Sequence, residues 1–222
     1  MHSPINLTII RFPEIRLPAR DAHKLRGYFG TMFHQHSPLL HNHLESGDSA
    51  YRYPLVQYKV LDGVPTLVGL NEGAELLISL FLNIKVLEIG DRSYHVYQKN
   101  IESKMINIGL SNDLHAYNFK TLWMALNQQN YAVFITEDEA QQVKHLKSIL
   151  TGNILSFYKG MDYWAEGTIM ANLKITNQCE TQFKNNAMLA FEGGFITNAL
   201  LPETIGLGKS VSRGFGTIVK SH

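Results

Sequence analysis

Histidines gather in one window of the chain. Five of the ten histidines fall within residues 23–43. Four of them form two H-x-H pairs, His34-Gln35-His36 and His41-Asn42-His43. Because the unperturbed pKa of imidazole lies nearest working pH, paired histidines are suited to proton transfer. The window therefore predicts either an acid/base pair or a metal site.

Three interpretations of this window remain open. Glu45 and Asp48 could complete a zinc site with the imidazoles. Alternatively, two histidines could act as general acid and base without a metal, or the histidines could be exposed residues at a helix end with no role. His41 and His43 follow a proline and precede a polar loop, where functional residues are common. We therefore expect His41 and His43, rather than His34, to form the functional pair.

A glycine-rich segment, GLGKSVSRGFG, occupies residues 206–216. Its glycines and cations are Gly206, Gly208, Gly214, Gly216, Lys209 and Arg213. Glycine permits positive φ and close backbone approach, so such a loop can turn N–H groups and cations toward phosphate. The P-loop pattern fails at Glu203 and the dinucleotide fingerprint fails at Val211, where each needs glycine. A surface hairpin with flexible turns is the alternative.

The tripeptide Tyr51-Arg52-Tyr53 follows the polar loop. A tyrosine hydroxyl can hydrogen-bond a phosphate oxygen, and arginine pairs with phosphate bidentately. The alternative is a strand edge with half-buried rings.

Composition limits the classes of function. The chain has 222 residues, enough for one large domain or two small ones, and a net charge of +1. That charge predicts no global attraction to nucleic acid, so binding would need a local patch. A single cysteine, Cys179, excludes a disulfide framework and favours a cytoplasmic location. The sequence shows no signal peptide and no apolar stretch long enough to span a bilayer.

The elements that would position these residues follow a ferredoxin-like order in the first half. Strands are predicted at 5–12, 53–61, 65–70, 85–89 and 94–98, and helices at 19–33 and 74–82. Asp62-Gly63 between the second and third strands is a strong hairpin signal. The order up to residue 89 is β-α-β-β-α-β.

The second half repeats this outline less clearly. Strands are predicted at 118–126, 168–176, 188–196 and 217–219, and a helix at 138–158. Gly193-Gly194 indicates a bulge, and 199–205 is too short, with Pro202, for a full second helix. The sequence thus predicts an α+β fold of two tandem ferredoxin-like (RRM-like) domains, the second degenerate and carrying the glycine-rich segment. We place the domains at 1–104 and 105–222.

Three stretches of the sequence together resemble the CRISPR repeat-RNA processing endoribonucleases of the RAMP superfamily. They are the glycine-rich segment, the region from Leu25-Arg26-Gly27 to His41-Asn42-His43, and the pair YPLVQYK (53–59) and GLNEGA (69–74). The combination is similar to the branch associated with type I-B systems.

This resemblance implies a metal-independent cut within each CRISPR repeat, with no cofactor. In such enzymes the 2′-hydroxyl attacks the scissile phosphate and leaves a 2′,3′-cyclic phosphate and a 5′-hydroxyl. It implies that His41 and His43 are the acid/base pair and that Tyr51 contacts the phosphate. Lys24 and Lys59 are candidates for an assisting lysine.

The resemblance also implies the partners. RNA binding would involve Arg52, Lys209 and Arg213 with the four glycines, and the partners would be CRISPR repeat RNA, a multi-subunit CRISPR effector complex and a second copy of the chain. No membrane partner is expected. The alternatives are a metal-dependent hydrolase, a non-catalytic RAMP-type RNA-binding subunit, and a generic RNA-binding module. Against the generic RNA-binding module, the RNP-like stretches of the sequence lack the paired aromatic residues that stack on bases in an RRM.

Overall fold

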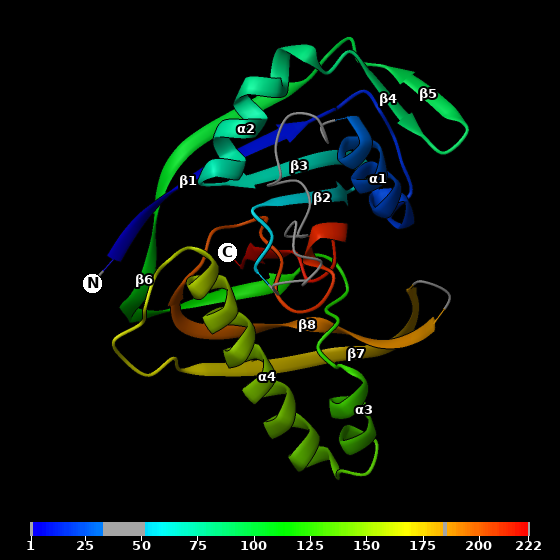
Figure 1. Ribbon diagram of the computed structural model, residues 1–222. Coiled ribbons are helices and arrows are strands. Elements are labelled where there is room, and N and C mark those ends of the chain that lie inside the picture. The colour runs from blue at the N-terminus through cyan, green and yellow to red at the C-terminus, as the bar shows by residue number, and fades with distance from the viewer. Residues whose placement is uncertain (1, 33–51, 184–185, 222) are drawn as a thin grey trace, which may run out of the picture. The chain divides into compact units, whose positions relative to one another are not determined.

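The computed structural model describes residues 2–32, 52–183 and 186–221 (Figure 1). The chain divides into two compact units. The N-terminal unit consists of Pro4–Asn107 and Ser212–Gly214. The C-terminal unit consists of Met1–Ser3, Ile108–Val211 and Phe215–His222.

The N-terminal unit combines an antiparallel sheet with two helices. Its elements are β1 (His2–Arg11), α1 (Ala22–Met32), β2 (Val56–Leu61), β3 (Val64–Leu70), α2 (Glu72–Leu80), β4 (Val86–Ile89), β5 (Arg92–His95) and the first part of β6 (Asn100–Phe119). The 3-10 turns Ala19–Asp21 and Phe81–Asn83 adjoin α1 and α2. The strand order is β2-β3-β1-β6, while β4 and β5 form a separate two-stranded sheet.

The hairpin between β2 and β3 is confirmed. Leu61 pairs with Val64, so Asp62 and Gly63 are the two turn residues. Their φ values are 50° and 79°. Positive φ at both positions is the requirement of a type I′ turn, which the Asp-Gly dipeptide satisfies.

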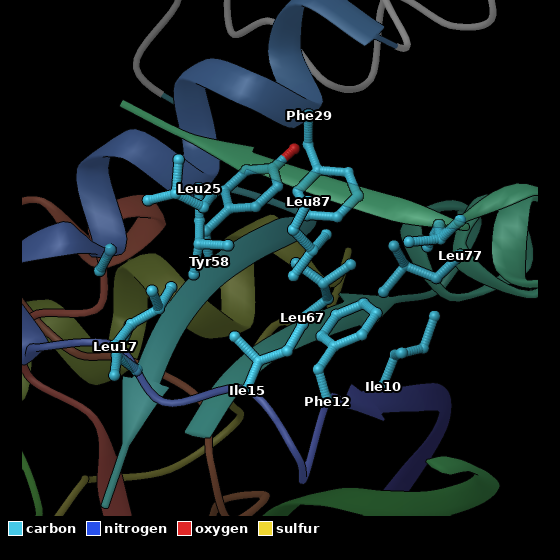
Figure 2. Close-up of a cluster of buried hydrophobic side chains, with 14 of the residues drawn as sticks. Ile10, Phe12, Ile15, Leu17, Leu25, Phe29, Tyr58, Leu67, Leu77 and Leu87 are labelled. Atoms are coloured by element: carbon cyan, nitrogen blue, oxygen red, sulfur yellow. The ribbon is translucent and has the colours of Figure 1, made fainter. Parts of the chain in front are cut away.

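The core of this unit lies between the sheet and its helices. Leu25 and Phe29 of α1 and Leu77 of α2 are buried against Tyr58 and Leu67 (Figure 2). Because side chains alternate along a strand, the residues beside Tyr58 face the other side of the sheet. One of these is Lys59, which is also fully buried.

The C-terminal unit has a similar sheet. It contains the rest of β6, α3 (Gln128–Phe134), α4 (Glu139–Gly160), β7 (Ala171–Phe183), β8 (Asn186–Leu200) and β9 (Ile218–Lys220). The β7–β8, β6–β8 and β6–β9 pairs are antiparallel, which gives the order β9-β6-β8-β7. Helix α4 packs on β7 and begins with a capping box formed by Asp138 and Gln141 (Figure 1).

Several predicted elements are confirmed and others are wrong. The α+β class and the three predicted helices, seen as α1, α2 and α4, are confirmed. The irregularity predicted at Gly193 is confirmed by its φ of 148°, although the register shift falls between Ile175 and Asn177, so the extra residue is on β7. The predicted strand 118–126 is wrong, because β6 ends at Phe119 and Trp123 makes only an isolated bridge to Phe191. Apolar residues at 123–126 are buried without joining a strand.

The fourth strand of the N-terminal sheet is also different from the prediction. The predicted strand 85–89 corresponds to β4, which pairs only with β5. Its place in the sheet is taken by β6, whose first residues are exposed and polar in large part. A strand with an exposed face lacks the apolar run that would have revealed it. Helix α3 was not predicted.

Candidate functional site

The predicted catalytic residues lie in residues 33–51, outside the described part of the chain. This holds for His41, His43 and Tyr51, and also for Glu45 and Asp48. Arg52, the next predicted site residue, is exposed. The hydroxyl of the neighbouring Tyr53 is buried and accepts a hydrogen bond from Gln57 Nε2 at 3.0 Å.

The glycine-rich segment is closed by its own backbone. Leu207 N donates to Gly216 O at 2.9 Å, and Gly206 bridges to Thr217. Gly216 has φ of 62°, and a Cβ there would overlap the Leu207 carbonyl oxygen. Gly206 is also crowded, since a Cβ there would lie 2.7 Å from Val211 Cγ1 and 2.8 Å from Phe215 O. These two glycines are therefore required by the packing of the segment itself.

Gly208 and Lys209 pack against Trp123 and Met124, which follow β6. Gly208 has φ of 92°, and a Cβ there would lie 2.8 Å from both Met124 O and Trp123 Nε1. Lys209 N donates to Met124 O at 2.9 Å, while the Lys209 side chain is half-buried. The backbone that carries this cation is thus fixed within the C-terminal unit.

Arg213 and Gly214 belong to the N-terminal unit. Gly214 has φ of 87°, and its ideal Cβ lies 3.2 Å from Tyr58 O and 3.4 Å from Ala22 Cβ. Arg213 is half-buried. Burial, and next the nearby charge of Arg26, lower the pKa of the Arg213 guanidinium.

The two candidate lysines differ sharply in their surroundings. Lys24 Nζ forms an ion pair with Asp21 Oδ1 at 2.9 Å, one turn back on the chain. Lys59 has 0% exposure, and burial lowers its pKa to about 7. A lowered pKa alone does not make Lys59 an acid/base group, because such a group must also reach the reacting atoms and this side chain is 0% exposed.

Two groups of the N-terminal unit were not singled out by sequence patterns. Arg26 is half-buried on α1. Tyr58 is 1% exposed, and no residue in the described ranges hydrogen-bonds its hydroxyl. The alternation of inward- and outward-facing side chains along β2 could have predicted that Tyr58 lies in the core. No local pattern predicts that its hydroxyl has no hydrogen-bond partner within the described ranges.

Within residues 2–32, 52–183 and 186–221, no three His, Cys, Asp or Glu side chains cluster as metal ligands do. The helices in those ranges include none that is both long and apolar enough to cross a membrane.

Comparison with protein families gives two matches that together cover the chain. Residues 3–107 match the Cas6b N-terminal domain. Residues 109–221 match the Cas6b C-terminal domain.

Solved structures and one sequenced relative agree with this. A crystal structure of Cas6b is 35% identical, with a TM-score of 0.91 over 99% of this chain and 100% of that one. A second, described as CRISPR RNA processing endoribonuclease Cas6b, is 31% identical, with a TM-score of 0.80 and the same coverage. An uncharacterized protein of Methanocaldococcus jannaschii is 33% identical over 141 residues, which are 64% of this chain and 96% of that protein. The chain therefore belongs to the Cas6b family.

Proposed function

We propose that this protein is an endoribonuclease that cuts CRISPR precursor RNA within its repeats. The observation that carries the proposal is the full-length similarity to a Cas6b described as a CRISPR RNA processing endoribonuclease, at 31% identity and a TM-score of 0.80. The family models support it by matching residues 3–107 and 109–221 in succession.

The proposal includes two tandem ferredoxin-like domains, 1–104 and 105–222, the second degenerate. Support comes from the strand orders β2-β3-β1-β6 and β9-β6-β8-β7. In a βαββαβ unit the first strand lies between the third and the last. Here β1 lies between β3 and β6 in the first unit, and β6 lies between β8 and β9 in the second. In the second, the glycine-rich segment stands where the second helix would be.

The proposed reaction is a transesterification without a metal or cofactor. One imidazole of the His41/His43 pair removes the proton of the 2′-hydroxyl, whose oxygen then bonds to the scissile phosphorus. The bond from phosphorus to the 5′-oxygen breaks, and the other imidazole, in its protonated form, donates its proton to that oxygen. The products are a 2′,3′-cyclic phosphate and a 5′-hydroxyl. Tyr51 hydrogen-bonds a phosphate oxygen in the transition state.

The proposed RNA contacts are basic side chains. Arg52, Lys209 and Arg213 are the proposed contacts, and the four glycines shape the segment that presents the last two. Further proposed partners are a multi-subunit CRISPR effector complex and a second copy of the chain. The proposed location is the cytoplasm.

The test is cleavage of end-labelled repeat RNA from the source organism in EDTA. We expect one cut by the wild type with a cyclic-phosphate end, and a loss of at least about 100-fold in rate for His41→Ala/His43→Ala. The matched control is His95→Ala, an exposed histidine on β5, which should cut at the wild-type rate.

Two results would contradict the proposal. Loss of cutting by the wild type in EDTA, restored by a divalent metal, would mean a metal-dependent hydrolase. Tight RNA binding without any cut would mean a non-catalytic RNA-binding subunit.

A further inference from the structure

Two arginines from distant parts of the sequence, Arg26 of α1 and Arg213, lie close enough for their charges to interact. Segment 212–214 packs on the start of this helix, since the ideal Cβ of Gly214 lies 3.4 Å from Ala22 Cβ. Arg213 is the next residue to Gly214. Arg26 is four residues beyond Ala22, so it lies one turn further along the same side of α1. Both arginines belong to the N-terminal unit and both are half-buried.

The charges of these arginines act on each other. The pKa of Arg213 is lowered first by burial and then by the charge of Arg26. Asp21, the acid that precedes Arg26 most closely in the chain, pairs with Lys24 at 2.9 Å. Like charges held partly out of water repel each other, and an anion between them reduces that repulsion.

The hydroxyl of Tyr58 provides a second observation at the same place. Tyr58 stacks on Phe29 at a ring distance of 5.8 Å, and its hydroxyl points toward α1 (Figure 2). The hydroxyl is buried, and within the described ranges no group bonds to it. Burial raises the pKa of Tyr58, with a smaller opposite effect from the nearby Arg26, so the proton stays in place. A buried hydroxyl without a partner in the described ranges is costly, and this one lies within range of the Arg26 charge.

We infer that Arg26 and Arg213 together bind one phosphate of the RNA backbone. This inference rests on the proposed function for the identity of the ligand. Guanidinium groups bind phosphate oxygens through paired N–H donors, and one phosphate between two arginines replaces their repulsion with attraction. Arg26 lies on the helix that precedes residues 33–51 in the sequence. Arg26 is thus a binding residue for the RNA backbone.

The first test uses inorganic phosphate and no RNA. Thermal unfolding is measured in phosphate and in chloride at equal ionic strength, for the wild type, Arg26→Gln, Arg213→Gln and Arg20→Gln. Arg20 is an exposed arginine just before α1 and serves as the control for lost charge. We expect phosphate to raise the Tm of the wild type and of Arg20→Gln, and to raise it less in the other two. Equal shifts in all four proteins would overturn the inference.

The second test measures RNA affinity at several salt concentrations. The RNA carries a 2′-deoxy nucleotide at the cleavage site, so it binds without being cut. For Arg26→Gln we expect weaker binding and a salt slope smaller by about 0.7, the value of one single-strand phosphate contact. The Arg26→Gln/Arg213→Gln double variant should bind RNA within about twofold of the weaker single variant, because both arginines hold the same phosphate and its contact is lost only once.

The outcomes separate this inference from the proposed function. Wild-type affinity and slope in Arg26→Gln, with normal cleavage by the wild type, would overturn the phosphate site alone. Phosphate protection that depends on both arginines would support the site even for a protein that fails to cut RNA.

Discussion

At the residue scale, Lys59 is the most perturbed of the candidate functional groups. Its pKa is lowered from 10.5 to about 7 because the side chain is fully buried. Between these two values the unfolded chain holds a proton that the folded chain has lost. The free energy of unfolding therefore increases as the pH rises through this range.

This predicts a measurable pH dependence of stability. Urea unfolding at pH 7, 8 and 9 should show an increase that approaches about 1.4 kcal/mol per pH unit. The substitution Lys59→Met should remove most of this increase, while Lys144→Met, at an exposed site on α4, should retain it. An unchanged pH dependence in Lys59→Met would show that another group is responsible.

Alanine substitutions distinguish glycines that the backbone conformation requires from glycines that another residue can replace. Gly216 has φ of 62° and no room for a Cβ beside the Leu207 carbonyl. We expect Gly216→Ala to lower the free energy of unfolding by at least about 1–2 kcal/mol. Gly152 lies inside α4 with nothing within 4 Å of an added Cβ, so Gly152→Ala should stabilise by about 0.5–1 kcal/mol. Thermal unfolding of both variants measures the two signs, and a stabilising Gly216→Ala would refute the crowding argument.

At the element scale, α4 depends on how it begins. Asp138 accepts from Gln141 N at 2.9 Å, and Gln141 Oε1 accepts from Asp138 N at 3.1 Å. These two bonds satisfy backbone donors that a helix start leaves unpaired.

Removal of this cap should destabilise the protein. We expect Asp138→Ala to lower the free energy of unfolding by about 1 kcal/mol in urea denaturation. Asp138→Ser keeps a side-chain acceptor and should remain close to the wild type. A loss as large for serine as for alanine would assign the effect to something other than the cap.

At the scale of the whole molecule, charge and repetition are the main features. A net charge of +1 over 222 residues gives no global attraction to RNA, so the proposed RNA binding depends on local groups such as the predicted contacts Arg52 and Lys209. Both units use the same order of strands, although β6 runs through both and pairs with β1 in one unit and with β8 and β9 in the other. The repetition agrees with the two successive Cas6b domains that the family models match.

The sequence by itself determined the features that depend on near neighbours. The Asp62-Gly63 turn, the helix α1 and the start of α4 each follow from residues within a turn or two, and all are confirmed. The family resemblance also came from short motifs. The assignment of His41, His43 and Tyr51 as catalytic residues still rests on such motifs and stays a prediction.

Only the tertiary structure decided the features that join distant residues. The pairing of β6, the burial of Lys59 and the charge interaction of Arg26 with Arg213 depend on segments that lie far apart in the chain. A strand with one exposed face has little apolar periodicity of its own, and a lysine in a strand carries no mark of what will cover it. Sheet partners and burial are properties of the packed molecule, so local pattern alone could not have predicted them.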